Sequence, residues 1–565
     1  MSKPIYVLGT GLSHNGSAVL LKDGIICVAI EKERITRLKH DGGNDSDAIQ
    51  YCLDAEGITL DDITVVVQCE NFTLPKRDFF KGKRLFADSN QPKIIDISHH
   101  LAHAYSAVGT SPFFECNVMV IDGCGSPLNQ FIELHPEQKD VVDASFFQIN
   151  SMQCEKDSFY HFDGQILKPL IKDFSVMAEQ TSSEFQLPTT QHSIGGFYAS
   201  ISKYVFGDMD DVGKLMGLAP FGTTGMYNFE AFEFQSGRLL VKDDWQQHFN
   251  NPSQGYDYFK EYFEYYANVA KWAQEQVEQA VIHCVKNRVE QFPNANLCYS
   301  GGVALNAVAN AKLDDLKLVK NLYIEPAAAD NGLALGCAFY GWMEYLKMPK
   351  IEHDGSTCFG KNYTNQEVDK ALISSEDYDT IKFDNEDELL RYCANKLNEG
   401  KTIGWFQSGS EFGPRSLGRR SILAHPSIVG MKDHINRNIK FREDFRPFAP
   451  AVLHEKVHEF FEVGRNSPYM ILVDKTRKEF VGQLQNVTHQ DGSARVQTIE
   501  KSWNSKFYKL VEAFEKKSGI AVLLNTSLNR KGMPIVETPA QALQLFIETA
   551  LDILVVEDTV LEKRV

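Results

Sequence analysis

Short apolar runs separated by glycine-containing turns open the chain. The runs cover residues 5–8, 17–21 and 25–30, with a glycine turn over 9–16 and a tight turn at 23–24. Runs of four to six apolar residues bounded by glycine are typical of buried strands. The pattern therefore predicts three successive strands joined by one longer glycine turn and one tight turn.

A second unit of the same kind begins at residue 117. An apolar run over 117–121 ends in Asp122-Gly123-Cys124-Gly125 and turns into a predicted second strand over 130–134. Two strand–glycine-turn–strand units in one chain indicate an internally duplicated, two-lobed α/β domain. We expect a nucleotide to bind in the cleft between the lobes.

Two further strands run into glycine and then into a helix. Residues 260–293 have helical spacing and lead into a strand over 296–299, which Gly301-Gly302 follow. Another strand over 322–326 precedes Asp330-Asn331-Gly332 and an apolar helix that extends through Trp342. A strand that enters paired glycines before a helix is typical of a nucleotide-binding loop.

The chain becomes polar and irregular over 347–382, and a domain boundary is expected there. The predicted organisation is a first domain over 1–355, a linker over 356–382 and a separate α/β domain over 383–565.

Composition restricts the class of protein. The 565 residues are 43% hydrophobic and 24% charged, which is typical of a globular chain with two or more domains. A net charge of −17 disfavours nucleic acid and anionic membranes as partners. Eleven cysteines without a C-x-x-C pair favour reduced thiols in the cytoplasm, and we expect neither a signal peptide nor a membrane span.

One stretch of this acidic chain is strongly basic. Residues 415–446 contain eight lysines and arginines against three acids, and Gly413-Pro414 and Arg446-Pro447 fix the backbone at the two ends of the stretch. Arginines spaced among fixed turns suit the capture of a small oxyanion such as phosphate or carboxylate. The commoner explanation of a charge run, a solvated basic face that pairs with acidic surface, stays open at this point.

Two histidines and two aspartates form a candidate metal site. His99 and His103 are four residues apart, so on a helix both imidazoles project from one face, and Asp122 and Asp330 each follow a predicted strand. Such a mixed nitrogen and oxygen set suits Fe(II), Mn(II) or Zn(II). The alternatives are core or capping histidines, and an N-cap role for Asp330.

Other polar residues lie where a ligand could bind. The turns with Gly123, Gly125, Gly301 and Gly302 could surround a nucleotide with backbone N–H groups, and His14 lies in the first glycine turn as an acid/base candidate or a simple cap. Further along the chain, Arg495 adds a cation. Asn525 and Ser527 follow an apolar strand, either as ligands of a phosphorylated substrate or as an ordinary turn.

Taken together, these residues resemble the O-carbamoyltransferases of nodulation-factor and antibiotic biosynthesis. The likeness extends over nearly the whole chain and rests on these motifs: HHLAHA (99–104), VIDG (120–123), GKLMGLAP (213–220), SGGVALN (300–306), PAAAD (326–330), FGPRSLG (412–418), FREDFRPFAP (441–450) and LNTS (524–527).

The resemblance implies a first domain of the ASKHA class (actin/Hsp70-like), similar to the threonylcarbamoyl-transferring tRNA modification proteins, and a YrdC-like second domain. The second domain would turn carbamoyl phosphate and ATP into carbamoyl adenylate, with magnesium accompanying the nucleotide. The carbamoyl group would then pass to a hydroxyl of a small natural product in the first domain. The resemblance does not identify the acceptor, and it leaves a homodimer open.

The resemblance also implies roles for residues at the motif positions. Those expected to hold carbamoyl phosphate and nucleotide are Arg415, Lys440, Arg446, Arg495, Asn525 and Ser527, with Lys440 and Arg446 as catalytic groups. Nucleotide would also contact Gly123, Gly125, Gly301, Gly302 and Asn306. His99, His103, Asp122 and Asp330 would bind Fe(II) or a similar divalent ion, and His14 would be the acid/base group near the acceptor.

Three other functions compete with this interpretation. Duplicated glycine turns alone would permit an ASKHA-type sugar kinase, which leaves the arginine-rich second domain unexplained. A non-catalytic sugar-binding module would predict missing metal ligands, whereas all four candidates are present. Threonylcarbamoylation of tRNA is disfavoured by the acidic balance.

Overall fold

The computed structural model describes residues 3–13, 15–43, 45–69, 92–142, 153–176, 193–235, 237–242, 244–372 and 375–564. The chain divides into two compact units. Unit 1 consists of Met1–Cys27 and Gly42–His353, and unit 2 of Val28–Asp41 and Asp354–Val565. A short segment from near the N-terminus therefore belongs to the same unit as the C-terminal part of the chain.

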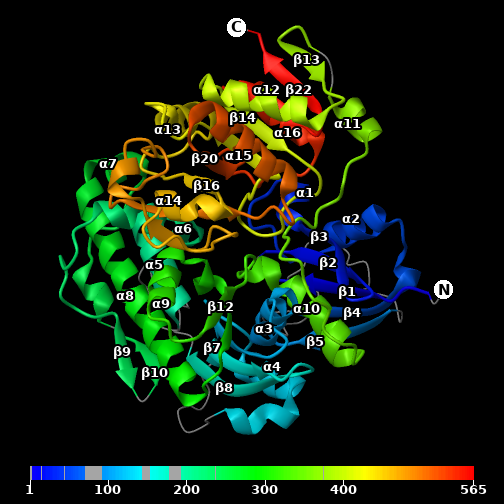
Figure 1. Ribbon diagram of the computed structural model, residues 1–565. Helices are drawn as coiled ribbons and strands as arrows, with labels where there is room; N and C mark the ends of the chain where they lie inside the picture. The colour runs from blue at the N-terminus through cyan, green and yellow to red at the C-terminus, as the bar shows by residue number, and fades with distance from the viewer. Residues whose placement is uncertain are drawn as a thin grey trace. The chain divides into compact units, whose positions relative to one another are not determined.

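The first five-stranded sheet has the order β3-β2-β1-β4-β5 and lies in unit 1, except for Val28–Glu31 of β3, which belong to unit 2 (Figure 1). Its strands are β1 (Tyr6–Gly11), β2 (Ser17–Lys22), β3 (Ile25–Glu31), β4 (Ile63–Cys69) and β5 (Lys93–Ile97). Strand β1 is antiparallel to β2 and parallel to β4, and β4 is parallel to β5. β1, β2 and β4 are almost entirely buried, as expected for strands that read as continuous apolar runs.

A second five-stranded sheet repeats this order as β8-β7-β6-β11-β12. Its strands are β6 (Cys116–Ile121), β7 (Gln153–Phe162), β8 (Leu167–Val176), β11 (Asn296–Ser300) and β12 (Asn321–Ile324). Strand β6 is antiparallel to β7 and parallel to β11, and β11 is parallel to β12. The directions of the strands therefore match those of the first sheet. The predicted fold class, a duplicated two-lobed α/β domain, is confirmed by these matching sheets.

Unit 1 also contains helices and a small two-stranded hairpin. The helices are α2 (Ser46–Glu56), α3 (His99–Thr110), α4 (Leu128–Leu134), α5 (Ile194–Phe206), α6 (Val212–Leu218), α7 (Tyr256–Glu261), α8 (Phe263–Gln291), α9 (Ala307–Asp315) and α10 (Leu333–Tyr340); the hairpin consists of β9 (Phe232–Gln235) and β10 (Arg238–Val241). Helix α3 follows the first sheet but packs on the second, and α10 follows the second sheet but packs on the first.

Helices α3 and α10 also pack on each other, and glycine permits their close approach. A Cβ at Gly336 would lie 1.7 Å from the carbonyl oxygen of Ala102, and one at Gly109 would lie 2.0 Å from the Phe339 ring. Any larger residue would push the helices apart. This contact places the first turn of α3 deep inside unit 1, where every residue of the helix is buried.

Two local predictions were wrong. Gly9-Thr10-Gly11 belongs to strand β1 and not to a turn; a Cβ at Gly9 would lie 2.1 Å from the carbonyl oxygen of Ala334, so the glycine serves close packing of α10. Residues 130–134 lie in helix α4, not in a strand, since Pro127 immediately precedes a helical turn. The partner strand of β6 is instead β7.

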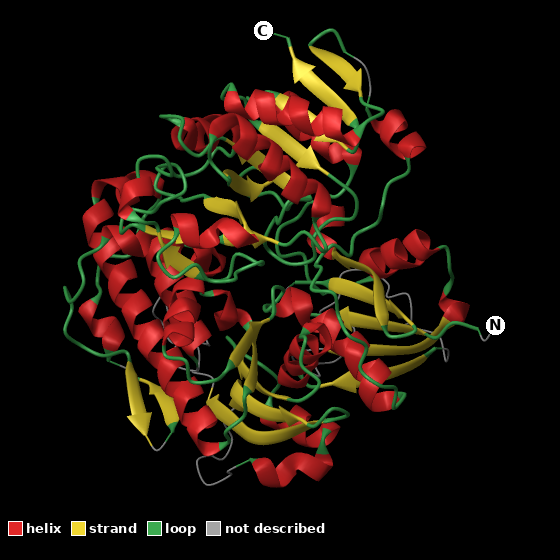
Figure 2. Ribbon diagram, viewed as in Figure 1, coloured by secondary structure: helices red, strands yellow, loops and turns green. Residues whose placement is uncertain are grey.

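Unit 2 is built around an eight-stranded mixed sheet with the order β13-β22-β21-β14-β15-β20-β16-β19. Figure 2 shows the strands of the protein in yellow and its helices in red. The strands of this sheet are β13 (Tyr378–Lys382), β14 (Ile403–Phe406), β15 (Arg420–Ala424), β16 (Ala449–Leu453), β19 (Gln497–Ile499), β20 (Val522–Ser527), β21 (Ile553–Val556) and β22 (Thr559–Lys563). A separate pair is formed by β17 (Val473–Lys475) and β18 (Ser493–Arg495).

The helices of unit 2 are α1 (Lys32–Thr36), α11 (Asn365–Ala371), α12 (Glu386–Asn398), α13 (Met431–His434), α14 (Val457–Phe460), α15 (Ser505–Ser518) and α16 (Pro539–Glu548). α12 packs on α15, and α15 and α16 pack on the sheet. Their apolar faces bury a continuous core with the strands, including Trp405 and Phe514. Residues 356–382, for which a linker was expected, contain α11 and β13.

Among the described residues, no helix combines the length and apolarity needed to cross a membrane.

Candidate functional site

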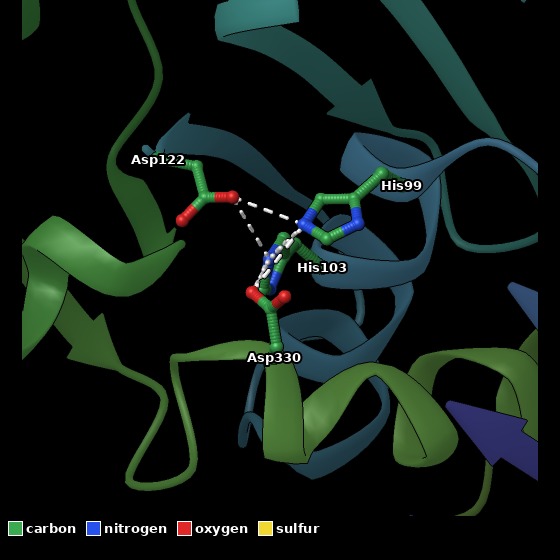
Figure 3. A group of neighbouring side chains, drawn as sticks. All are labelled: His99, His103, Asp122 and Asp330. Atoms are coloured by element: carbon green, nitrogen blue, oxygen red, sulfur yellow. Dashed lines mark hydrogen bonds and ion pairs between the residues drawn. The ribbon is translucent and has the colours of Figure 1, made fainter. Parts of the chain in front are cut away.

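The four candidate metal ligands converge on one point inside unit 1 (Figure 3). His99 and His103 extend from the first turns of α3, Asp122 directly follows strand β6, and Asp330 begins a short 3₁₀ turn before α10. All four side chains are buried, and one ligand atom from each lies within 4.8 Å of the others. The i,i+4 spacing on a helix and the duplicated strand–turn pattern bring them together.

The contacts in this cluster are close. The Nε2 atoms of His99 and His103 are 3.1 Å apart, and His99 Nε2 lies 3.0 Å from Asp122 Oδ2. His103 Nε2 lies 3.7 Å from the same oxygen, and Asp330 Oδ1 lies 3.5 Å from His99 Nε2 and 3.8 Å from His103 Nε2. Two imidazole nitrogens that face each other at this distance can share at most one proton between them.

The electrostatics of the cluster follow from burial and opposite charge. Burial lowers the pKa of His99, but Asp330 and Asp122 outweigh burial and raise this pKa well above its usual value. Burial raises the pKa of Asp122, but His103 and His99 outweigh it and hold this pKa well below its usual range. The carboxylate of Asp122 is therefore ionised at neutral pH.

The residues present fit a divalent metal ion. Two imidazole nitrogens and two carboxylates supply four nitrogen and oxygen donors, and two negative charges would balance a divalent cation. The second oxygen of Asp122 accepts a hydrogen bond of 2.8 Å from the backbone N–H of Gly302, which orients the carboxylate from outside the cluster. The identity of the metal does not follow from this donor set.

Gly301 shapes this region through its backbone. Its φ of +92° lies in a region that favours glycine, and a Cβ there would lie 2.2 Å from the carbonyl oxygen of Ile121. The absence of a side chain at Gly301 therefore lets the turn after β11 pack against the end of β6, directly before Asp122.

The predicted nucleotide contacts are largely engaged within the protein. The backbone N–H of Gly301 donates to the Ala328 carbonyl oxygen, that of Gly302 to Asp122, and that of Gly125 to the Glu155 carbonyl oxygen. Asn306 caps α9 by accepting from the Ala309 N–H, and its amide exchanges hydrogen bonds with Gln274. Nucleotide binding by Gly123, Gly125, Gly301, Gly302 and Asn306 stays a prediction. His14 lies outside the described residues.

Unit 2 holds the cationic residues that the sequence singled out. Burial and Arg446 lower the pKa of Arg415 to about 10. Burial, followed by the charges of Arg415, Arg442 and Arg446, lowers the pKa of Arg495 well below its usual value. Mutual effects of this kind arise only between charges that lie close together, so these four arginines form a cluster, which we call the arginine cluster.

Lys440 lies beside the arginine cluster, with Arg442, Arg446 and Lys39 nearby. Burial lowers its pKa, and these three positive charges lower it further. Its ammonium group donates to the Ser527 carbonyl oxygen (2.6 Å), the Ser527 hydroxyl (3.0 Å) and Asn529 Oδ1 (2.6 Å). The three N–H donors of the lysine are matched by three acceptors at the end of β20.

Backbone and amide groups hold the arginine cluster in place. A π-helical turn over Ile435–Ile439 immediately precedes Lys440, and within it Asn436 accepts from Arg442 Nε (2.8 Å) and donates to the Arg446 carbonyl oxygen (3.2 Å). Such turns are frequent at functional sites. Asn525 lies in strand β20 and not in a turn; it donates to the Ser416 carbonyl oxygen and to Gln497.

Only part of the basic stretch over residues 415–446 forms a solvated face that pairs with acidic side chains. Arg437 is 61% exposed and pairs with Asp444, whereas Lys440 is 2% exposed. Arg415, Arg442, Arg446 and Arg495 are half-buried. The arginine cluster is therefore separate from the exposed ion pair of Arg437 and Asp444.

The segment Val28–Asp41 supplies residues of unit 2 that the sequence interpretation missed. Glu31 Oε1 accepts from the Gly413 N–H at 2.7 Å, and Arg34 donates to the Gly413 carbonyl oxygen at 2.7 Å. Glu31 and Arg34 form a buried ion pair with a contact of 2.6 Å. They fix both polar groups of Gly413, two residues before Arg415. Residues nearly 400 positions apart carry no sequence signal of such a contact.

Comparisons with known proteins cover both units. Residues 7–73 and 64–339 match the family model described as Carbamoyltransferase N-terminus, and residues 394–563 match the one described as Carbamoyltransferase C-terminus. Together these matches include all eight motifs on which the sequence resemblance rested.

Several curated relatives align with the chain. Nodulation protein NolNO of Sinorhizobium fredii is 30% identical over 98% of this chain and 79% of its own length. An uncharacterised protein of Synechocystis is 30% identical over 99% of this chain and 97% of its own. The 3'-hydroxymethylcephem-O-carbamoyltransferase of Amycolatopsis lactamdurans is 34% identical over 43% of this chain and 44% of its own.

Among solved structures, HypF of T. kodakarensis aligns at 14% identity over 61% of this chain and 49% of its own, with a TM-score of 0.37.

Proposed function

The chain belongs to the carbamoyltransferase family, and from that premise we propose that it is an ATP-dependent O-carbamoyltransferase of small-molecule biosynthesis. Unit 2 would release phosphate from carbamoyl phosphate and join the resulting carbamate to the AMP part of ATP, with loss of pyrophosphate, to form carbamoyl adenylate. Unit 1 would then transfer the carbamoyl group from the adenylate to a hydroxyl of the acceptor, which releases AMP. The observation that carries the proposal is the pair of sites described above, an arginine cluster in unit 2 and a buried His/Asp cluster in unit 1.

The arginine cluster supports the binding of a small phosphorylated anion. Like charges that lower one another's pKa destabilise the empty site, and an anion with two or more negative charges would relieve this repulsion. Arg415, Arg446 and Arg495 would bind the phosphate through guanidinium forks. Glu443 is the acid next to Arg446, at 3.9 Å, and it also pairs with Lys531, so it offsets only part of the positive charge.

Lys440 would position the substrate beside the arginine cluster. Its amino group is held by Ser527 and Asn529, and a bound phosphate would favour the charged form that burial and the neighbouring cations disfavour. Held in this way, the positive charge would stabilise negative charge that develops on the phosphoryl oxygens without the cost of reorienting a flexible side chain. Asn525 and Ser527 would orient the same ligand from neighbouring positions of the strand.

The His/Asp cluster supports a metal-dependent transfer step in unit 1. A divalent ion held there by His99, His103, Asp122 and Asp330 would supply Lewis-acid polarisation of a carbamoyl or phosphoryl oxygen, with Fe(II) as the first candidate. Gly302 holds Asp122 in its ligating orientation, and burial of all four side chains excludes water from their surroundings. Exclusion of water would protect a labile carbamoyl intermediate from hydrolysis. His14 would act as the acid/base group near the acceptor hydroxyl.

The proposal is tested by pyrophosphate release from the purified chain. We expect release with ATP plus carbamoyl phosphate and none when carbamoyl phosphate is omitted. Formation of ADP in the presence of a sugar would instead favour a sugar kinase, and pyrophosphate release with ATP alone would contradict the proposed order of steps. Hydroxylated metabolites can then be screened as acceptors against the active protein.

A further inference from the structure

The N-terminus of helix α3 is capped by groups from outside the helix. Ser98 precedes the helix without a capping hydrogen bond from its own side chain. The backbone N–H of His99 instead donates to Ser126 Oγ at 2.9 Å, and that of His100 donates to Glu155 Oε2 at 3.2 Å. The first N–H groups of a helix have no partner within it, so these external acceptors help to determine where α3 begins.

The same carboxylate also holds the loop that follows strand β6. Glu155 Oε2 accepts from the Ser126 N–H at 2.9 Å. Two backbone hydrogen bonds join Glu155 itself to this loop, from the Gly125 N–H at 2.9 Å and to the Ser126 carbonyl oxygen at 3.1 Å. One acidic residue of strand β7 therefore contacts both the helix with His99 and His103 and the loop that begins with Asp122.

Glycine allows this close approach. A Cβ at Gly125 would lie 2.7 Å from Glu155 Oε2 and 2.7 Å from the His100 ring. Any side chain at this position would displace either the carboxylate or the first turn of α3. Gly125, which was expected to contact nucleotide, thus has a packing role in the structure.

Lys172 balances the charge of Glu155. The two side chains form an ion pair that is fully buried on both sides, and the Lys172 ammonium also donates to Tyr160 Oη at 2.8 Å. It lies 4.7 Å from the centre of the Phe131 ring, a cation–π contact. A buried carboxylate without such a partner would be costly, whereas negative charge at a helix N-terminus is favourable.

We propose that Glu155 is the positioning residue of the His/Asp cluster: it fixes α3 against the loop that carries Asp122, and Lys172 balances its charge. The inference rests on the proposed metal site, whose four ligands come from three elements: helix α3, the loop after β6 and the turn before α10. Three of these ligands lie on the two elements that Glu155 joins. A shift of one element against the other would move His99 Nε2 relative to Asp122 Oδ2, which are now 3.0 Å apart.

No pattern in the sequence indicates this role. Glu155, Lys156 and Asp157 are three charged residues in a row, a run that is typical of a solvated loop. In the structure they lie in buried strand β7, and each has a partner of opposite charge.

The experiment compares metal binding by metal-free full-length variants, titrated with Co(II) and followed by its visible absorption and by calorimetry. We expect Glu155→Ala to weaken Co(II) binding by about 10–100-fold, as loss of groups that orient metal ligands commonly does. The double variant Glu155→Gln/Lys172→Met keeps an acceptor for the two N–H groups without an unpaired buried charge. It should bind Co(II) more tightly than Glu155→Ala.

Asp173→Asn is the matched control. Asp173 follows Lys172 in strand β8, faces the opposite side of the sheet and forms a buried ion pair with Lys156 at 3.1 Å. This variant should bind Co(II) like the wild type. Unchanged Co(II) affinity in Glu155→Ala, or an equal loss in Asp173→Asn, would overturn the positioning role.

Amide hydrogen exchange separates this inference from the proposed function. In metal-free Glu155→Ala, the amides of His100 and Ser126 should exchange faster than in the wild type, while those of α10 should not change. If the wild type fails to bind Co(II), the metal site is refuted and the exchange result alone decides the role of Glu155. If these two amides stay equally protected, the positioning role is refuted.

Discussion

At the scale of single residues, position in the fold separates arginines that the sequence does not distinguish. Arg437 and Arg446 are nine positions apart in one basic stretch. Arg437 is exposed and paired with Asp444, whereas Arg446 is half-buried and influences the pKa of Arg415, Arg442 and Arg495. Only the second arrangement creates an excess of positive charge that a bound anion can neutralise.

Substitution of Arg446 by alanine should therefore lower the rate of pyrophosphate release by about 100-fold or more, the usual cost of removing a preorganised donor. Arg437→Ala, in the same stretch, should leave this rate unchanged. His103→Ala should also retain pyrophosphate release but lose transfer to the acceptor. Loss of pyrophosphate release in both Arg446→Ala and His103→Ala would contradict separate roles for the two units.

Glu325 gives the stability of the protein a pH dependence. Its carboxyl group is fully buried, accepts from the Ala327 N–H at 3.0 Å, and burial raises its pKa to about 7. Between the ordinary value near 4.5 and about 7, the folded protein keeps a proton that the unfolded chain has released. The free energy of unfolding should then fall as pH rises through this window, by an amount on the order of 3 kcal/mol.

Urea unfolding of the metal-free protein at pH 5 and pH 8 measures this effect. Glu325→Gln keeps the hydrogen-bonding groups but cannot titrate, so the difference in unfolding free energy between the two pH values should shrink in this variant. An identical difference in wild type and variant would show that other groups cause the pH dependence.

At the scale of elements, the structure depends on contacts between segments that are distant in the sequence. Helix α10 packs on the sheet of the opposite repeat, and the contact of Gly336 with α3 brings Asp330 toward the histidines. In unit 2, helix α1 and the residue before it act as part of the C-terminal fold, since Glu31 and Arg34 hold Gly413. Neither contact involves residues that are neighbours in the chain.

The ion pair of Glu31 and Arg34 should contribute strongly to the stability of unit 2. Both side chains are buried, at 7% and 2% exposure, so Glu31→Gln would leave the Arg34 guanidinium with a weaker partner. We expect a loss of about 3 kcal/mol in the free energy of unfolding, measured in urea. Lys382→Met removes an exposed ion pair with Asp369 in the same unit and should cost no more than about 1 kcal/mol. Equal losses in the two variants would contradict a structural role of the segment Val28–Asp41.

At the scale of the whole molecule, the two candidate sites belong to different compact units. The His/Asp cluster lies entirely in unit 1, and the arginine cluster with Lys440 lies entirely in unit 2. If each unit performs one step of the proposed reaction, the two steps should respond separately to conditions that affect only one site.

Removal of the divalent metal from the full-length protein provides this test. After treatment with a chelator and return of Mg²⁺ for the nucleotide, pyrophosphate release should continue while transfer to an acceptor stops. Addition of Fe(II) should restore transfer. Pyrophosphate release that also requires Fe(II) would contradict the assignment of the metal to the transfer step.

The sequence by itself determined the local features of this protein. Most of the expected strands, the helical spacing of His99 and His103, the aspartates at strand ends and the clustering of arginines follow from short-range patterns. Such patterns depend on residues within one turn or one strand, where propensity and periodicity act directly. The motif resemblance identified the family for the same reason, since each motif is a short continuous segment.

Only the tertiary structure decided which distant residues meet. The assignment of Val28–Asp41 to unit 2, the role of Gly9 in packing, and the contact of Glu155 with both α3 and the Asp122 loop depend on distances between elements. Buried charged residues such as Glu155 and Lys172 are stable only because each finds its partner on another segment. A linear pattern of charge contains no information about that partner, so these residues resemble solvated surface until the chain is folded.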